Sequence, residues 1–133
     1  MNGFSYAVTS ILKHNVMYHA SSLGLVLNGD LFPAASELLS QLRANNLLVE
    51  SKLNNFVRFD YIVMPKYVLN IRKFLSCLTR LASGGIMVLE ITGSDNKYED
   101  KYLNIVGGTM SATKVRYQDR SYIVIHTGED YGD

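Results

Sequence analysis

The stretch Leu78-Thr-Arg-Leu-Ala-Ser-Gly-Gly-Ile-Met-Val-Leu-Glu90 decides the fold, because it joins a helix end, a glycine pair and an apolar strand. The apolar side chains that lead into it recur at the spacing of one helix face: Val68, Ile71, Phe74, Leu75, Leu78 and Leu81. This stripe predicts an amphipathic helix that packs on a sheet and ends at the C-cap Ser83-Gly-Gly85. The apolar residues 86–91 then predict a buried strand.

The same plan of buried strand, proline and amphipathic helix occurs earlier in the chain. Residues 23–29 and 59–64 are apolar on both faces, which is typical of strands covered by helices on both sides. Pro33 follows the first of these strands and suits the opening of a helix, whereas Pro65 stops the second. Strands that alternate with helices imply right-handed crossovers and a parallel sheet.

The remaining segments complete the expected architecture. Residues 4–14 predict a short helix and residues 47–51 a short strand. The polar residues 95–100 are expected to form a surface loop or a short helix. Residues 114–118 and 122–126 flank the polar turn Asp119-Arg-Ser and predict an antiparallel hairpin. The predicted fold class is therefore α/β, a three-layer, mostly parallel sheet that is flanked by helices and ends in an antiparallel β-hairpin.

Composition excludes several classes of protein. Hydrophobic residues make up 47% of the chain, charged residues 19% and proline only 2 positions, which excludes a disordered or collagen-like chain. The formal net charge is +1, so a nucleic-acid partner is not expected. No apolar run approaches the roughly 20 residues that span a bilayer, so no membrane segment is expected. Residues 1–10 lack a secretory pattern and the single Cys77 cannot form an internal disulfide, which favours a cytoplasmic location.

The order of elements resembles the Rossmann-like fold of the class I methyltransferases, which use S-adenosylmethionine. The stretch from Leu78 to Glu90 resembles that family's passage of helix, leucine, small residues, Gly-Gly, apolar strand and acid. Phe59-Asp-Tyr-Ile-Val resembles the family's approach to its fourth strand, and residues 113–127 resemble its reversed last strand. The resemblance covers residues 24–127 and implies a single methyltransferase-like domain over residues 1–133. It also implies S-adenosylmethionine bound beyond the carboxyl ends of the parallel strands.

The resemblance implies a cofactor site around Gly29, Asp30 and Glu50. The family's first strand normally ends in an acid followed by alternating glycines, which let the backbone approach the cofactor. Gly29 matches the first glycine, and the Gly29–Asp30 turn would face the methionine end. Glu50, at the end of the second predicted strand, matches the carboxylate that hydrogen-bonds the ribose hydroxyls. A simply solvated Glu50 is the alternative.

The same loop departs from the family's pattern at three positions. Leu27 stands where the acid is expected, and Leu31 and Pro33 stand where the later glycines are expected. Side chains of this size would intrude on the space of the cofactor's methionine part. A plain strand-to-helix turn is therefore the competing interpretation.

Met64, Pro65 and Tyr67 are the residues that the resemblance places at the border of the substrate. In many amino- and nucleobase-methylating relatives this loop reads Asn/Asp-Pro-Pro-Tyr, and here it reads Met64-Pro-Lys-Tyr67. Pro65 and Tyr67 fit, but Met64 cannot accept a hydrogen bond from a target nitrogen. Tyr67 as an aromatic that packs on the following helix is the alternative to a stacking role.

Other chemical signals are weaker. His14, His19 and His126 lack the spacing of metal ligands, so no metal is expected. There is no Gly-x-x-x-x-Gly-Lys-Ser/Thr phosphate loop. Lys114 and Arg116 share one strand face, with Tyr117 and Tyr122 nearby. This arrangement would suit either a small nucleic-acid surface or a solvated sheet edge, and the solvated edge is preferred.

The sequence therefore favours a diverged methyltransferase-like domain that is catalytically silent and binds a ligand or a partner. That partner would be a second copy of the chain or another protein. The alternative is an active S-adenosylmethionine-dependent methyltransferase on an unknown acceptor. A small nucleotide-binding Rossmann domain is the third interpretation, which fits Glu50 but explains the terminal hairpin less well. Cys77 is expected to be a buried structural thiol rather than a nucleophile.

Overall fold

A computed structural model describes residues 2–14, 21–46, 48–54, 56–91, 96–106 and 110–127. Within these residues six strands form one sheet in the order β2-β1-β3-β4-β6-β5. The strands are β1 (Leu23–Val26), β2 (Leu48–Glu50), β3 (Phe59–Met64), β4 (Leu81–Ile91), β5 (Met110–Tyr117) and β6 (Arg120–Thr127). The first four are parallel, and β6 and β5 add an antiparallel hairpin beside β4. The predicted α/β class is confirmed, with its parallel sheet and reversed edge.

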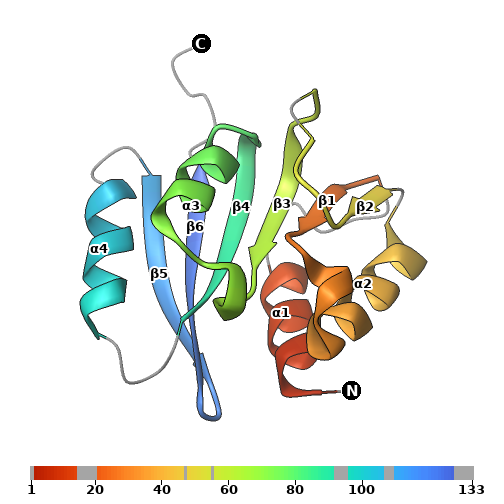
Figure 1. Cartoon of the computed structure of the whole chain (residues 1–133), viewed down its shortest axis with the longest axis horizontal. Coiled ribbons are helices and arrows are strands. Elements are labelled where there is room, and N and C mark those ends of the chain that lie inside the picture. Colours follow the sequence, from red (N-terminus) through yellow and green to blue (C-terminus); the bar gives the residue numbers. More distant parts are fainter. Residues whose placement is uncertain are drawn as a thin grey trace.

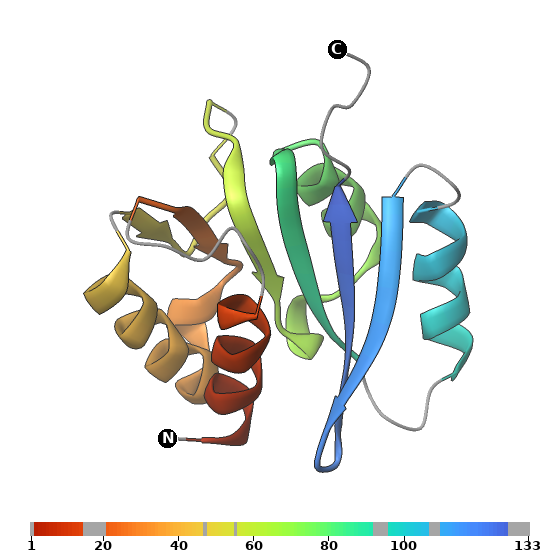
Figure 2. The same cartoon turned by 180° about the vertical axis from the view of Figure 1, so that it is seen from behind.

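Helices cover both faces of the sheet (Figures 1 and 2). They are α1 (Gly3–Lys13), α2 (Pro33–Asn45), α3 (Ile71–Leu78) and α4 (Asn96–Val106). Helices α1 and α2 pack on one face, and α3 and α4 on the other. None of the helices in the described residues is long and apolar enough to cross a membrane.

The alternation of side chains along the strands creates two cores. In β3, Tyr61 and Val63 face α1 and α2, whereas Ile62 and Met64 face α3 and α4, and all four are fully buried. Strands with apolar residues on both faces fit only between two helix layers, which is why these runs are continuous in the sequence.

Two helix starts follow from capping chemistry. Pro33 occupies the first turn of α2, where its missing N–H is harmless, and Asn46 ends this helix. The side chain of Asn70 caps α3 by accepting from the N–H of Lys73 at 2.9 Å. The polar segment after β4 forms α4, which is longer than the short helix or loop that was expected.

The prediction that a helix ends at Ser83-Gly-Gly85 is wrong. Helix α3 ends at Leu78, and β4 begins at Leu81, because the N–H of Phe59 already pairs with the carbonyl of Arg80 at 2.8 Å. The register against β3 shifts at this point, and Gly84 adopts a left-handed φ of 77°. A Cβ at Gly85 would lie 2.9 Å from the carbonyl oxygen of Asp60. The glycines therefore serve a bulge in a strand, where the two backbones approach closely.

The buried face of α3 also differs from the predicted stripe. Phe74 and Cys77 are fully buried, whereas Leu75 is 45% exposed. Val68 lies in a separate 3-10 turn, η2 (Lys66–Val68), so the predicted apolar stripe is not continuous. The face that α3 buries is therefore rotated relative to the predicted stripe. The expectation that Cys77 is a buried thiol is confirmed.

Candidate functional site

The carboxyl ends of the parallel strands bring together residues from distant parts of the chain. Glu50 pairs in register with Leu25, and the N–H of Asn28 donates to the carbonyl of Ser51 at 2.7 Å. Gly29, which opens the 3-10 turn η1 (Gly29–Leu31), therefore lies at the same edge as Glu50. The β5–β6 turn also lies at this edge, the lower one in Figure 1. Of the predicted cofactor residues, Glu50 is half-buried, Asp30 is exposed and Gly29 is buried.

The turn after β1 is shaped by local packing. Asn28 has a left-handed φ of 52°, a conformation that Asn tolerates well. A Cβ at Gly29 would lie 2.7 Å from Cγ1 of Val26, so this glycine is required by the close return of the chain onto its own strand. Leu31 is 68% exposed and does not fill the interior as expected.

Phe32, the next residue after Leu31, is the side chain of this turn that packs inward. Its ring stacks on Tyr67 with centroids 5.3 Å apart and an interplanar angle of 26°. Tyr67 follows β3 in η2, and Lys66 lies 5.2 Å from the centre of the Tyr67 ring. Nothing local in the sequence shows that the turn after β1 folds toward the end of β3, so the pairing of Phe32 with Tyr67 could not be predicted.

The loop after β3 splits the three predicted substrate-border residues. Met64 is fully buried among the residues under α3 and α4. Pro65 and Tyr67 line a cavity of about 60 Å³, together with Phe32, Glu90 and Arg120. A water needs roughly 10–15 Å³ of such space, so this cavity has room for a few waters. Pockets for drug-sized ligands start near about 300 Å³, and this cavity is far smaller.

A partly buried ion pair lines this cavity. Glu90, only 4% exposed at the end of β4, accepts from Nη1 of Arg120 at 2.6 Å and from the backbone N–H of Lys66 at 3.2 Å. Desolvation lowers the pKa of Arg120, but the hydrogen bond and charge of Glu90 outweigh it and raise that pKa overall. Burial, aided by the charge of Glu90, raises the pKa of the Tyr122 phenol. The sequence does contain a signal for this ion pair, because Glu90 is a carboxylate within the otherwise apolar run 86–91. A buried charge requires a partner.

A larger pocket lies on the α3 side of the same edge. It has a volume of about 350 Å³ and lies between the end of β1, the segment after β2 and helix α3. Leu27 and Asn28 contribute from the turn after β1, and Lys52 and Leu53 from the segment after Glu50. Helix α3 contributes four residues: Arg72, Lys73, Ser76 and Cys77. Burial raises the pKa of the Cys77 thiol to about 11, more than the charge of Lys73 lowers it, so this thiol is not a nucleophile at neutral pH.

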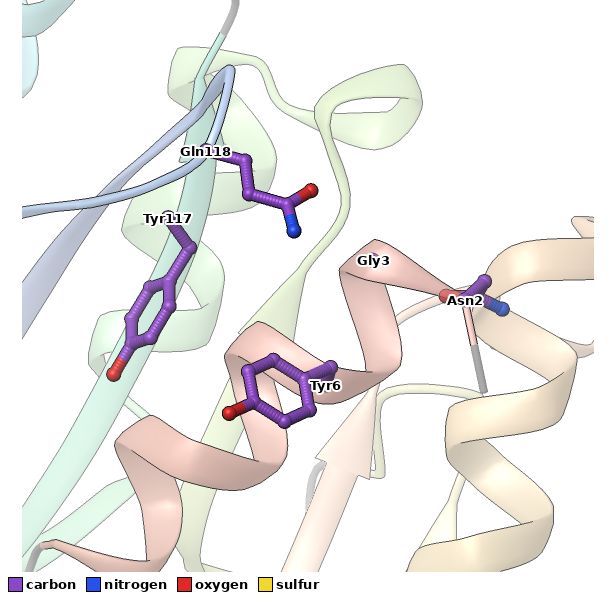
Figure 3. A pocket seen from close by; sticks show the side chains of 5 residues that line it. All are labelled: Asn2, Gly3, Tyr6, Tyr117 and Gln118. Atoms are coloured by element: carbon purple, nitrogen blue, oxygen red, sulfur yellow. The ribbon is translucent and has the colours of Figure 1, made fainter.

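A third hollow, of about 440 Å³, separates α1 from the β5–β6 turn (Figure 3). Tyr6 on α1 meets Tyr117 edge to face, with ring centroids 6.5 Å apart. The Asn2 side chain is already occupied as the cap of α1, accepting from the N–H of Ser5 at 2.8 Å. Gln118 lines the opposite wall on the turn. This hollow is an open surface feature at the carboxyl edge, on the α1 side of the sheet.

The other candidate residues form no metal site in the part of the chain that the structure describes. No group of three His, Cys, Asp or Glu side chains lies close enough there to hold a metal ion. His14, at the end of α1, and His126, on β6, line the same open hollow of about 250 Å³, and His19 lies outside the described residues. Tyr117 packs on the α1 side of β5, whereas Arg116, its neighbour in the strand, projects from the opposite face. The aromatic and basic side chains of the hairpin thus do not interleave on one surface.

Solved structures with the same fold include several methyltransferases, but their sequences are remote. A class I S-adenosylmethionine-dependent methyltransferase from Listeria monocytogenes, described as putative, matches at a TM-score of 0.67 and 6% identity over 97% of this chain and 60% of that chain. Precorrin-6y C5,15-methyltransferase from Geobacter metallireducens matches at 0.57 and 11% identity over 92% and 88%. A Streptococcus mutans protein, described as a putative methyltransferase in complex with S-adenosylhomocysteine, matches at 0.53 and 12% identity over 95% and 98%.

These likenesses define the fold class. No protein-family model and no curated protein sequence matches the chain. The chain therefore has the methyltransferase-like Rossmann fold, as the sequence predicted. At these identities the likeness establishes the fold, and function has to be argued from the site itself.

Proposed function

We propose that this domain no longer transfers methyl groups and that it binds a small ligand at the carboxyl edge of its sheet. Methyl transfer requires the sulfonium, the methyl group and the acceptor to lie in line at close range. By the resemblance, that arrangement would lie between the turn at Gly29 and the loop from Met64 to Tyr67. The rings of Phe32 and Tyr67 stack between these two segments, and the cavity beside them has a volume of only about 60 Å³; this observation carries the proposal.

The neighbouring pocket of about 350 Å³ supports the ligand-binding part of the proposal. Its volume falls within the range of small-molecule sites, and it opens at the carboxyl edge, where parallel sheets bind ligands. Glu50 ends β2 two residues before Lys52, which lines the pocket. A hollow of this size favours a small ligand over the protein partner that was the other expectation.

Active methyl transfer with S-adenosylmethionine is the second candidate. It is favoured by the fold shared with methyltransferases and by the position of Glu50 at the edge, level with the turn after β1. Glu50 would then hydrogen-bond the ribose of the cofactor. The chain's own residues would have to open the Phe32–Tyr67 stack to admit the methionine end.

Calorimetric titration with S-adenosylmethionine and S-adenosylhomocysteine separates the two candidates. The proposal expects no heat with either compound up to millimolar concentration. Micromolar binding that is lost in Glu50→Ala would overturn the silent assignment and support the methyltransferase. Asp100→Ala, an exposed carboxylate on α4, is the matched control and should behave as the wild type.

A further inference from the structure

The pocket beside α3 has a strongly one-signed charge. Lys52, Arg72 and Lys73 line it and are all exposed, and none of the described residues that line it is acidic. Within the described residues, none of the three cations forms an ion pair with a carboxylate. The whole chain carries a net charge of only +1, so this concentration of positive charge is local.

The position of Arg72 and Lys73 on α3 adds to this imbalance. Both lie in the first turn of the helix, which contains no acidic residue. The helix dipole places partial positive charge at this end, so cations here are unfavourable and an anion is favoured. An anionic ligand in the pocket would therefore offset three side-chain charges and the helix end together.

The remaining walls suit the uncharged part of such a ligand. Leu27 and Leu53 give the pocket an apolar side, and Cys77, fully buried, lies at its base. Asn28 lines the pocket and Glu50 ends β2 beside it, where their side-chain oxygens can accept hydrogen bonds from hydroxyl groups. The pocket thus combines three cations, an apolar wall and nearby hydroxyl acceptors.

We propose that this pocket binds a nucleoside monophosphate, with the phosphate on Lys52, Arg72 and Lys73 and the nucleoside along Leu27 and Leu53. This inference rests on the proposed ligand-binding function and names its ligand class. S-adenosylmethionine fits the same charges poorly, because its sulfonium and amino groups outnumber its single carboxylate. Lysine and arginine side chains recognise phosphate through charge-assisted hydrogen bonds.

The test is calorimetric titration of the full chain with AMP, GMP, CMP and UMP, beside adenosine and inorganic phosphate. At least one monophosphate should bind, and its affinity should fall as salt is raised because exposed charges are screened. Arg72→Gln and Lys73→Gln should each weaken binding by about tenfold, the usual scale for one charge-assisted hydrogen bond. Lys101→Gln, the same change on exposed α4, should leave affinity unchanged.

The outcomes separate this inference from the function on which it rests. A monophosphate that binds equally to wild type, Arg72→Gln and Lys73→Gln, or no more tightly than its nucleoside, would overturn the phosphate site while leaving a ligand-binding domain. No heat with any of these compounds would overturn the inference as well. S-adenosylhomocysteine binding that depends on Glu50 would instead overturn the silent function. Circular dichroism confirms that the exposed-site variants remain folded.

Discussion

The phenol of Tyr61 in β3 donates a hydrogen bond of 2.6 Å to the side-chain oxygen of Asn46 at the end of α2, and both residues are buried. The ring of Tyr61 lies against the adjacent strand at Gly24, where a Cβ atom would overlap it. Strand β1 can therefore lie between β2 and β3 only because residue 24 has no side chain.

Gly24→Ala should lower the free energy of unfolding by about 2–3 kcal/mol, because the Tyr61 ring or β1 must move within a packed core. Urea unfolding followed by circular dichroism measures the loss. Gly3→Ala is the control, since a Cβ there meets only the flexible side chain of Arg120, at 3.4 Å. Equal losses in both variants would contradict this account of Gly24.

Arg120→Met should destabilise the protein by about 1–3 kcal/mol, since removing this partly exposed partner leaves a buried carboxylate uncompensated. The charge left behind is Glu90, which would keep only the N–H of Lys66 as a partner. Arg116→Met, on the neighbouring exposed strand position, should change stability by less than about 0.5 kcal/mol. A small loss in Arg120→Met, measured by the same unfolding curves, would show that the pair is not needed for the fold.

The buried thiol of Cys77 should make stability fall at alkaline pH. Its folded pKa is about 11, above the ordinary value of 9.0, because burial disfavours the thiolate. Below pH 9 the thiol is neutral in both the folded and the unfolded state. Between pH 9 and 11 the unfolded chain loses the proton first, so the free energy of unfolding falls by about 2–3 kcal/mol. Unfolding curves at pH 8, 9, 10 and 11 measure this slope. Cys77→Ala should start less stable and lose less over the same interval, and parallel slopes would contradict the assignment.

Gln118→Gly should stabilise the β5–β6 turn by about 0.5–1 kcal/mol, because glycine adopts a positive φ without steric cost. Gln118 has a φ of 56° and is exposed. Asp119→Gly changes the next turn residue, which has no positive φ, and should be destabilising or neutral. Thermal unfolding distinguishes the two, and a gain in Asp119→Gly alone would show that the turn has a different conformation.

Phe32→Ala should lower stability by about 1–2 kcal/mol through loss of half-buried area and of its stacking on Tyr67. Leu31→Ala, next to it but 68% exposed, should change stability by less than about 0.5 kcal/mol. Chemical unfolding of the two variants compares the adjacent side chains directly. The reverse order of losses would mean that Leu31, rather than Phe32, closes the turn after β1.

Much of the architecture could be predicted from local patterns. The strand at residues 59–64, the helix opened by Pro33 and the hairpin near residue 119 all carry their own spacing or turn chemistry, and the structure confirms them. The error at Ser83-Gly-Gly85 has a specific cause. A glycine pair after an apolar helix suits a C-cap as well as it suits a bulge, and only the approach of Asp60 in β3 distinguishes them.

The placement of Gly29 and Glu50 at one edge followed from the sequence, because parallel strands joined by right-handed crossovers end on the same side. Their expected role in holding a cofactor stays a prediction. Leu31 was the wrong residue to expect inside, since the direction of a side chain in a short turn depends on what the turn packs against.

The sequence by itself determined the order of strands and helices and which faces are apolar, because helical and strand periodicities are local properties of the chain. Only the tertiary structure decided which side chains meet at the carboxyl edge. Phe32 reaches Tyr67, and Glu90 pairs with Arg120 thirty residues later, through contacts between segments that have no local relationship. Such contacts depend on strand order and crossover, so the Phe32–Tyr67 stack and the positively charged pocket beside α3 appear only when the sheet is assembled.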